Sequence, residues 1–451
     1  MAKYSVGEGG DFTTLAAAAK AAKPGDVFDL LTGTFNELFE CRVPDVTWRA
    51  SEGQQPVIDA GWNGKEVEGY VNAVNIVADG VGIYGVKVVN SPGRGIAISS
   101  SGVTVSGCSF FNCYHGGLVA NGTKEGYIRN LRIENNRFEK LSQSWITEKN
   151  PKNVAGSFIF VRVRESVVVG NVITDGYGEG LNIDRDTDGC VYMLNAVIST
   201  NHAGCYFCRS TNNVVTNCVF IHRLEKEYQG ASGNWPAAVV FGDETASASF
   251  GPQSGNEFRE NVVVSWGRLL EVRNGKNYDT RLTGTKILSN TFVSGPKTTY
   301  GIQVAKHDKG PHDVEFADNV VWFDNAVPGS PIAGEANGFR CEGNAWSVEP
   351  PPSMRSGSDI YGDLMLANPA APVAPTFDVD NYRPLPDSPL VSEDYYYGAL
   401  EPVEIAEPEP PPNGGDPLLK TKLNALRQQL SGISDEMEIA IAAVDGIIDS
   451  L

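Results

Sequence analysis

The sequence predicts an all-β solenoid in which short parallel strands wind into stacked coils. Ten times between Tyr84 and Trp346, a pair of small or polar residues is followed two residues later by a large apolar residue. A repeat of this kind, at intervals of roughly 20 to 45 residues, is typical of solenoids. Val- and Ile-rich runs with period-two alternation surround the copies and indicate strands. The apolar ends of the copies are Val88, Phe110, Phe138, Ile173, Ile198, Phe220, Val263, Phe292, Val321 and Trp346.

The second residue of this repeated motif predicts the structure of the turn that the motif forms. It is asparagine in six copies, namely Asn136, Asn171, Asn261, Asn290, Asn319 and Asn344, and cysteine in two, Cys108 and Cys218. Asparagine can satisfy turn amides with its side chain, so stacked copies can form a hydrogen-bonded ladder. Coils with three short strands and three turns define a parallel β-helix, which we expect over residues 37–348.

Both ends of the predicted solenoid carry closing elements. Residues 1–36 contain an alanine-rich stretch that we expect to form a capping helix, starting at Thr13 or Thr14 and ending at Pro24 and Gly25. An open solenoid end exposes core and unpaired backbone, so a covering helix is expected there. Residues 349–400 form the predicted closing segment at the other end.

These features resemble the right-handed parallel β-helix superfamily of pectate lyase type. The resemblance is carried by the asparagine ladder, by residues 4–35 and by the segment FDVDNYRPLPDSPLV, residues 377–391. It implies a right-handed β-helix. Because the superfamily hosts lyases, hydrolases, epimerases and non-enzymatic adhesins, it leaves the activity open.

The C-terminus has a different composition. Residues 401–417 are acidic and rich in proline and glycine, which predicts an extended linker. In residues 418–451, apolar residues alternate at spacings of four and three, which is a heptad seam. Because Ile433 and Ile447 occupy d positions, we expect a trimeric or tetrameric coiled coil. The alternative is a single helix docked on its own β-helix.

A β-helix joined to a coiled coil resembles phage tailspikes and virion fibres. That resemblance implies a homotrimer that is made in the host cytoplasm, attaches to other virion proteins and acts extracellularly on host surface polysaccharide. The chain start has no apolar core of a signal peptide. A non-enzymatic structural or decorating protein of the virion is one alternative, and a bacterial polysaccharide lyase or glycoside hydrolase is another.

Composition narrows the range of partners. The formal charge of −19 argues against binding to nucleic acid or to an anionic membrane surface. No apolar run is long enough to span a bilayer, so we expect no membrane insertion. The eight cysteines are scattered without a paired metal motif, so packing is their simplest role. We expect no cofactor.

Two insertions at one turn locate a candidate site. Residues 139–155 and 221–236 are longer than the equivalent turns in other coils, and the two coils between them have short turns. This arrangement predicts a groove with two walls. The short turns place Asp175, Glu179 and His202 together as candidate acids and bases, either for glycoside hydrolysis or for elimination.

Other residues around this turn are candidates for sugar binding. The walls carry Trp145 and Trp235, which could stack on sugar rings, and the same turn holds Tyr177 and His115. In FVRVRE we expect Arg162 and Arg164 to point outward with Phe160, where they could recognise an anionic glycan or pair with Asp184 and its neighbours. The alternative for each of these residues is an ordinary structural role, and the candidate set is Trp145, Arg162, Arg164, Tyr177, Asp184, Trp235 and His115.

The segment DRDTDG, Asp184 to Gly189, matches the first half of a calcium loop. The acidic residue expected at the end of such a loop is missing, because Asn195 stands there. A partial Ca²⁺ site is one interpretation of this segment, and a polar turn with side-chain caps is the simpler one.

Overall fold

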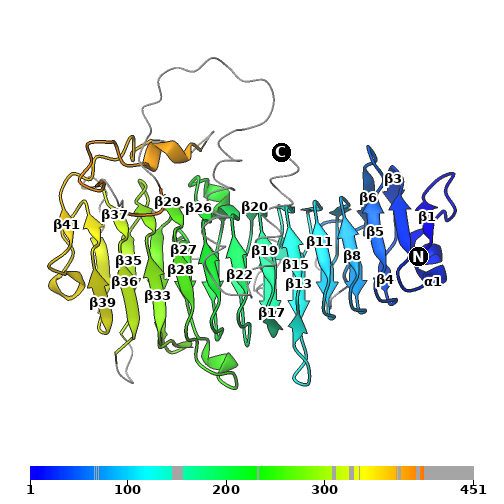
Figure 1. Cartoon of the computed structure of the whole chain (residues 1–451), viewed down its shortest axis with the longest axis horizontal. Helices are drawn as coiled ribbons and strands as arrows, with labels where there is room; N and C mark the ends of the chain where they lie inside the picture. Colours follow the sequence, from blue (N-terminus) through cyan, green and yellow to red (C-terminus); the bar gives the residue numbers. More distant parts are fainter. Residues whose placement is uncertain are drawn as a thin grey trace, which may run out of the picture. The chain divides into compact units, whose positions relative to one another are not determined.

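The computed structural model describes residues 1–65, 67, 69, 71–144, 156–230, 233–306, 311–324, 330–334, 336–371, 373, 377–392 and 397–400. These residues wind into a parallel β-helix whose coils each contribute strands to three sheets, here called A, B and C (Figure 1). The predicted all-β solenoid is confirmed. The predicted linker, residues 401–417, and the predicted coiled coil, residues 418–451, lie outside the described residues.

The bounds of the strands are as follows. Sheet A stacks β1 (Lys3–Val6), β2 (Val27–Leu30), β5 (Thr47–Ala50), β8 (Gly82–Tyr84), β11 (Thr104–Ser106), β15 (Arg132–Glu134), β19 (Val167–Val169), β22 (Val191–Met193), β25 (Val214–Thr216), β28 (Glu257–Arg259), β33 (Thr285–Leu288), β36 (Val314–Ala317) and β39 (Phe339–Glu342). Sheet B stacks β3 (Gly33–Phe35), β6 (Pro56–Asp59), β9 (Lys87–Val89), β12 (Ser109–Phe111), β16 (Arg137–Glu139), β20 (Val172–Gly176), β23 (Ala196–Thr200), β26 (Val219–Ile221), β29 (Val262–Val264), β34 (Thr291–Val293), β37 (Val320–Trp322), β40 (Ala345–Trp346) and β41 (Ile360–Tyr361). Sheet C stacks β4 (Phe39–Cys41), β7 (Val74–Ile76), β10 (Arg94–Ile98), β13 (Gly116–Asn121), β17 (Phe158–Val161), β21 (Glu179–Ile183), β24 (Ala203–Phe207), β27 (Ala237–Phe241), β30 (Arg268–Val272), β35 (Tyr300–Val304) and β38 (Ser330–Gly334).

A few short elements lie outside the three sheets. They are the helix α1 (Leu15–Ala21), the strand pairs β14 (Ile128–Arg129) with β18 (Val163–Arg164) and β31 (Asn274–Gly275) with β32 (Tyr278–Asp279), and the single turns η1 (Lys226–Tyr228), η2 (Thr245–Ser247), η3 (Pro352–Met354) and η4 (Val379–Tyr382). Among the described helices, none is long and apolar enough to cross a membrane.

The repeated motif forms the turn from sheet A to sheet B. Its first residue adopts a left-handed backbone in every copy, with φ between 52° and 67° from Gly85 to Gly343. The asparagine that follows then hydrogen-bonds to the asparagine of the next coil. Asn171 Nδ2, for example, donates to Asn195 Oδ1 at 3.0 Å, and Asn290 Nδ2 donates to Asn319 Oδ1 at 3.0 Å. The predicted ladder is therefore confirmed, and it satisfies buried polar groups along the solenoid.

One coil departs from the predicted register. The sequence pattern placed its apolar anchor at Ile198, but Val197 pairs with Ile173 and Phe220 and lies in the core. The motif in this coil begins at Leu194, whose φ is 55°, and its second residue is Asn195. Asn195 is thus a seventh rung of the ladder. Cys218 follows it, and its backbone N–H donates to Asn261 Oδ1 at 2.9 Å.

The interior is a continuous apolar core that runs through all three sheets. Its inward side chains stack in columns because equivalent residues lie one strand spacing apart. Phe110 and Phe138 stack at 4.8 Å between ring centroids, and Phe207 and Phe241 stack at the same distance. Seven of the eight cysteines are buried and all eight thiols are free, which agrees with the packing role expected for them.

The helix α1 packs against the N-terminal end of the solenoid. Thr14 is its N-cap, and its hydroxyl accepts a hydrogen bond from the Ala17 N–H at 3.1 Å. The Glu37 carboxylate accepts two more from the free N–H groups of the first turn. Leu15 and Ala18 are fully buried. The helix therefore covers core that an uncapped coil would expose, as the sequence predicts.

The segment after the last coil turns back over the outer face of sheet B. Leu364, Tyr382 and Leu390 are buried against outward side chains of that sheet, including Val293 and Val320. The Gly398 N–H donates to the Asp318 carbonyl at 3.0 Å, so the segment reaches the strands β34 and β37 (Figure 1). Residues 349–400 therefore cover a face of the solenoid as well as its end.

Candidate functional site

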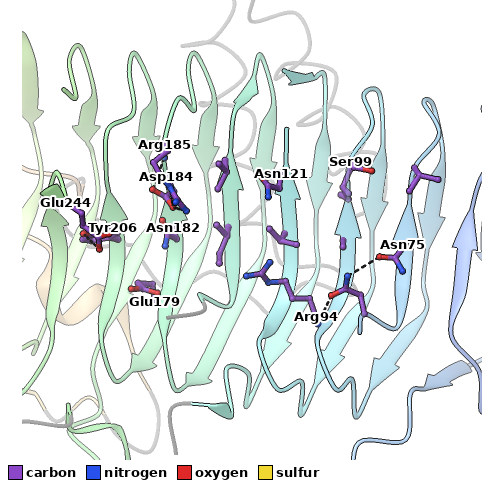
Figure 2. A pocket seen from close by; sticks show the side chains of 17 residues that line it. Asn75, Arg94, Ser99, Asn121, Glu179, Asn182, Asp184, Arg185, Tyr206 and Glu244 are labelled. Carbon is purple, nitrogen blue, oxygen red and sulfur yellow. Dashed lines mark hydrogen bonds and ion pairs between the residues drawn. The ribbon is translucent and has the colours of Figure 1, made fainter. Parts of the chain in front are cut away.

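A groove of about 670 Å³ lies on the outer face of sheet C (Figure 2). The strands from β7 to β24 form its floor, and residues of the turns leading to sheet A form one side. The residues that line it are Asn72, Asn75, Val77, Arg94, Ala97, Ile98, Ser99, Val119, Asn121, Ile159, Val161, Glu179, Asn182, Asp184, Arg185, Tyr206 and Glu244. The groove therefore runs across successive coils, parallel to the direction in which they stack.

One column of paired residues forms the centre of the floor. It consists of Asn75, Ala97, Val119, Ile159, Asn182 and Tyr206, each paired with the next. Five strand spacings of about 4.8 Å give this column a length of about 24 Å. Its middle is aliphatic, because Ala97 packs against Val119, Ile159 and Val161. Both ends are polar, and the end formed by β21 and β24 carries the acidic residues.

Glu179 and His202 contact each other at this acidic end. Glu179 begins β21 and is 2% exposed, while His202 lies in the turn before β24. His202 Nδ1 lies 2.7 Å from Glu179 Oε1. The other carboxylate oxygen, Oε2, is buried and has no hydrogen-bond partner among the residues that the structure describes. The structure thus brings together two of the three residues predicted as acids and bases, and it leaves one oxygen of Glu179 available to a bound molecule.

The loop from residue 242 to residue 256 brings Glu244 to the same end of the groove. Asp243 is fully buried and accepts hydrogen bonds from the Arg209 N–H at 2.7 Å and from the Gln253 N–H at 3.1 Å. Arg209 in turn donates to the carbonyls of Glu244 and Phe250 at 3.2 and 3.3 Å. Asp243 and Arg209 are therefore positioning residues that fix the backbone on which the Glu244 side chain stands.

Glu244 differs electrostatically from an ordinary surface carboxylate. Burial, together with the negative charges of Asp184 and Glu179, raises the pKa of the Glu244 carboxyl above its usual value. The Tyr206 hydroxyl donates to Glu244 Oε1 at 3.2 Å, which opposes this rise in part. Glu244 therefore holds a proton at a higher pH than an exposed glutamate does, which suits it to act as a general acid.

Asn182 and Asp184 line the same end of the groove, on the outward face where the sequence places them. Asn182 is 7% exposed, and its Oδ1 is buried and finds no hydrogen-bond partner among the described side chains and backbone. Asp184 pairs with Arg185, whose guanidinium lies 2.6 Å from Oδ2. The acidic end therefore contains three carboxylates and one arginine, and that arginine already has a carboxylate partner.

The third predicted acid, Asp175, lies elsewhere. It belongs to β20 of sheet B and has a left-handed backbone, at a turn position where Asn112, Lys140 and Ser199 have the same conformation in their own coils. Its carboxylate pairs with Arg223 and accepts the Thr174 hydroxyl at 2.8 Å. Glu179 belongs to sheet C, so the structure does not join Asp175 and Glu179 in one pair of carboxylates.

Tyr177 connects the same turn to the longer loop that follows β26. Its ring packs against Tyr228 with centroids 5.5 Å apart, and its hydroxyl hydrogen-bonds to Glu227. Burial, followed by this glutamate, raises the pKa of Tyr177. Trp235 belongs to the same loop and packs edge-on against His222 at 5.6 Å. In these contacts both aromatic residues stabilise the wall itself.

The segment FVRVRE is two short strands rather than one. Arg162 separates β17 from β18 and has φ of 54°, so the predicted alternation breaks there. Phe160 and Val163 are both in the core, whereas Val161 lines the groove. The prediction that Phe160, Arg162 and Arg164 share one face is therefore wrong, because a left-handed residue reverses the alternation.

The two arginines nevertheless lie at the surface beside the groove. The Arg162 guanidinium lies 4.9 Å from the centre of the Phe250 ring and 4.0 Å from Asp186. That of Arg164 lies 3.7 Å from the Tyr127 ring centre and 3.7 Å from Asp188. These contacts agree with the ion-pair interpretation that the sequence also allowed.

The remaining predicted residues have simple placements. His115 is 3% exposed and packs edge-on against Tyr114. Trp145 lies outside the described residues. In the segment DRDTDG, the three aspartates face separate arginines, namely Arg185, Arg162 and Arg164. No group of three potential metal-ligating side chains gathers within the described part of the chain, and Ca²⁺ at this turn stays a prediction.

Comparison with known proteins supports the fold. The family described as right-handed beta helix region matches residues 72–321, which is more than half of the chain. No curated protein matches this sequence. A solved mannuronic-acid-specific polysaccharide family 6 lyase from human gut microbiota is similar, with 14% identity and a TM-score of 0.51, over 80% of this chain and 92% of that one.

Two further solved structures share the architecture. The alginate lyase AlyGC of family PL6 is 14% identical with a TM-score of 0.50, over 86% of this chain and 58% of that one. The Dettilon tailspike protein is 15% identical with a TM-score of 0.42, over 72% of this chain and 55% of that one. Identities this low show the fold alone, and the tailspike likeness is too distant to support an argument about function.

Proposed function

This chain belongs to the right-handed β-helix family, and we propose that it binds a polysaccharide along the groove of sheet C and hydrolyses it at the acidic end. The observation that carries this proposal is the convergence of Glu179, Asp184 and Glu244 on one end of a single groove. Glycosidases use a pair of carboxyl groups, one protonated and one ionised, on either side of the bond that they cleave.

The shape and lining of the groove suit a linear glycan. A floor about 24 Å long is long enough for several linked sugar rings to lie along it. Its aliphatic middle offers Ala97, Val119 and Ile159 to the apolar faces of sugar rings, and its ends offer hydrogen-bonding groups. Because the floor is built from paired strands of one sheet, these groups are held in a fixed geometry before the ligand binds.

The proposed roles follow from the environments of the two glutamates. Glu244, with its raised pKa, donates a proton to the glycosidic oxygen as the bond from that oxygen to the anomeric carbon breaks. Glu179 uses Oε2 to take a proton from the water that attacks the anomeric carbon. His202 holds the other oxygen of Glu179 at 2.7 Å and therefore acts as a positioning residue.

The products distinguish hydrolysis from the two main alternatives. Purified protein is incubated with a panel of capsular, lipopolysaccharide and plant-type glycans. New reducing ends without unsaturated uronates are expected. Unsaturated uronates would identify an elimination, as in a polysaccharide lyase, and tight binding without any cleavage would identify a non-enzymatic glycan-binding protein.

A variant ties the activity to the site. Glu179→Gln removes the proposed base while it keeps the shape of the side chain, and we expect cleavage to fall by about 100-fold or more. Glu52→Gln is the matched control, because Glu52 is exposed in a turn between β5 and β6. Equal activity of the two variants would contradict the role of Glu179.

We also propose that the protein is a spike-like or fibre-like virion component that acts on the surface polysaccharide of a host cell. The heptad seam of residues 418–451 supports this proposal, because it is typical of chains that assemble into trimers. Mass photometry of the full chain and of a chain ending at residue 400 tests it. We expect the full chain to have three times the monomer mass and the shortened chain to be monomeric. An unchanged oligomeric state would contradict a role of this seam in assembly.

A further inference from the structure

Two buried hydrogen-bond acceptors at the acidic end of the groove have no partner within the described part of the chain. They are Glu179 Oε2 and Asn182 Oδ1, and both side chains belong to β21. The two residues are 2% and 7% exposed, and both line the groove (Figure 2). A buried acceptor without a donor is unfavourable, because it has lost its hydrogen bonds to water. A molecule that brings hydrogen-bond donors to this place therefore binds more favourably than one that brings acceptors.

The charges at this end of the groove also disfavour a ligand that brings hydrogen-bond acceptors. Glu179, Asp184 and Glu244 supply three carboxylates, and among the described residues Arg185 is the one arginine that lines the groove beside them. Arg185 hydrogen-bonds to Asp184 through Nε at 2.9 Å, so its charge is directed at that carboxylate. His202 faces Glu179 from the next coil. The local field therefore opposes an anionic group close to Glu179 and Glu244.

We propose that the sugar bound at the acidic end is an uncharged ring that donates hydroxyl hydrogen bonds, and that uronic acids and sulfated sugars are excluded from this position. This inference rests on the proposed glycan-binding function and specifies its substrate class. Asn182 Oδ1 accepts a hydrogen bond from a ring hydroxyl, while Glu179 Oε2 accepts one from the attacking water. A sugar carboxylate in the same place donates no hydrogen bond and is repelled by the two glutamates. The preference for a neutral sugar therefore comes from this repulsion as well as from the hydrogen bonds that the neutral sugar makes.

Calorimetric titration with two sets of oligosaccharides of equal length tests the inference. One set is neutral and contains gluco-, galacto- and manno-oligosaccharides, and the other contains oligogalacturonate and oligomannuronate. We expect at least one neutral ligand to bind more tightly than either uronate. Raising the salt concentration is expected to narrow the gap, because salt screens the repulsion of the uronates.

Variants of Asn182 test whether the preference for neutral sugars depends on Asn182 Oδ1. Asn182→Leu removes the acceptor, and we expect the affinity for the neutral ligand to fall about 3- to 10-fold. Asn182→Asp keeps an acceptor and adds charge, so neutral binding is retained and uronate binding weakens further. Gln303→Leu is the matched control, because Gln303 belongs to the same outward column and has a buried unpaired Oε1, but does not line the groove.

Each result decides between specific alternatives. Uronates that bind at least as tightly as every neutral ligand, with a dependence on Asn182, would overturn this inference and leave the proposed glycan site intact. The same affinity loss in Asn182→Leu and Gln303→Leu would overturn the assignment of the subsite. If no carbohydrate in either set binds, the proposed function fails together with the inference.

Discussion

The outer faces of sheets B and C are built from the same repeat but are used differently. On sheet B, outward residues such as Val262, Val293 and Val320 are buried beneath the segment that follows the last coil. On sheet C, the outward face between β7 and β24 is open and carries the groove. The repeat therefore determines the solenoid, while the path of the chain after the solenoid determines which face remains accessible.

The polar chemistry of the two faces differs accordingly. The covered part of sheet B presents mainly aliphatic side chains, whose burial is favourable without hydrogen-bond partners. The acidic end of the groove on sheet C presents two buried acceptors, Glu179 Oε2 and Asn182 Oδ1, that have no hydrogen-bond partner among the described residues. Such groups reduce stability, and active sites are the places where proteins retain them.

The largest expected effect concerns the proposed acid. Glu244→Gln keeps the size of the side chain and removes its proton, so we expect the rate of glycan cleavage to fall by about 100- to 10,000-fold. Substrate affinity is expected to change little, because the groove floor is intact. Initial rates across substrate concentrations separate the two effects. Loss of affinity with an unchanged maximal rate would assign Glu244 to binding rather than to proton transfer.

A second substitution tests the covered face. Tyr382 is 1% exposed, packs on sheet B and stacks on Phe377 at 5.6 Å. Tyr382→Ala is expected to lower the free energy of unfolding by about 3–5 kcal/mol through the cavity that it leaves. Tyr361→Ala is the matched control, because Tyr361 is 41% exposed, and it is expected to change stability by less than about 0.5 kcal/mol. Urea unfolding measures both, and equal effects would mean that the segment adds no buried surface.

A matched pair of substitutions compares outward positions on the two sheets directly. Ala97 faces outward from β10 into the groove, and Ala196 faces outward from β23 of sheet B. Ala97→Trp places a large side chain on the groove floor and is expected to weaken glycan binding by about 10-fold or more, since it blocks the path of the ligand. Ala196→Trp is expected to leave binding unchanged. Weakening by both variants would show that the glycan is not confined to sheet C.

Much of the fold could be predicted from the sequence because a solenoid repeats its turns. The left-handed first residue and the asparagine that follows recur in coil after coil, so the pattern is visible without any long-range information. The pattern slips only at Leu194 to Ile198, where two adjacent β-branched residues fit the apolar position equally well. Pairing of Val197 with Ile173 settles that register, and pairing is a property of neighbouring coils rather than of the local sequence.

The site was only partly predictable, for two physical reasons. Counting from the repeat identified Glu179 and Asp184, which line the groove, and His202, which contacts Glu179, but the groove lies on the outer face of sheet C and no described residue of the two predicted walls lines it. The repeat could not say on which side of a turn a residue lies. Asp175 and Glu179 are four residues apart and belong to different sheets. The repeat does not place Glu244, because this residue belongs to the loop from residue 242 to residue 256. Its place in the groove depends on the buried contacts of Asp243 with Arg209, which join residues more than 30 positions apart.

The smallest expected effect concerns the pH dependence of cleavage. Glu244 must be protonated to act as an acid, so activity is expected to fall as the pH rises through its raised pKa. The negative charge of Asp184 is one cause of that rise, after burial. Asp184→Asn removes this charge and lowers the pKa of Glu244, so the alkaline limb of the rate profile is expected to move to lower pH. Asp186→Asn is the matched control, because Asp186 lies in the same turn but faces Arg162. An alkaline limb that stays at the same pH in Asp184→Asn, or that moves equally in both variants, would show that this limb does not report the protonation of Glu244. The acidic end of the open groove would then lack the electrostatic property that distinguishes it from the covered face.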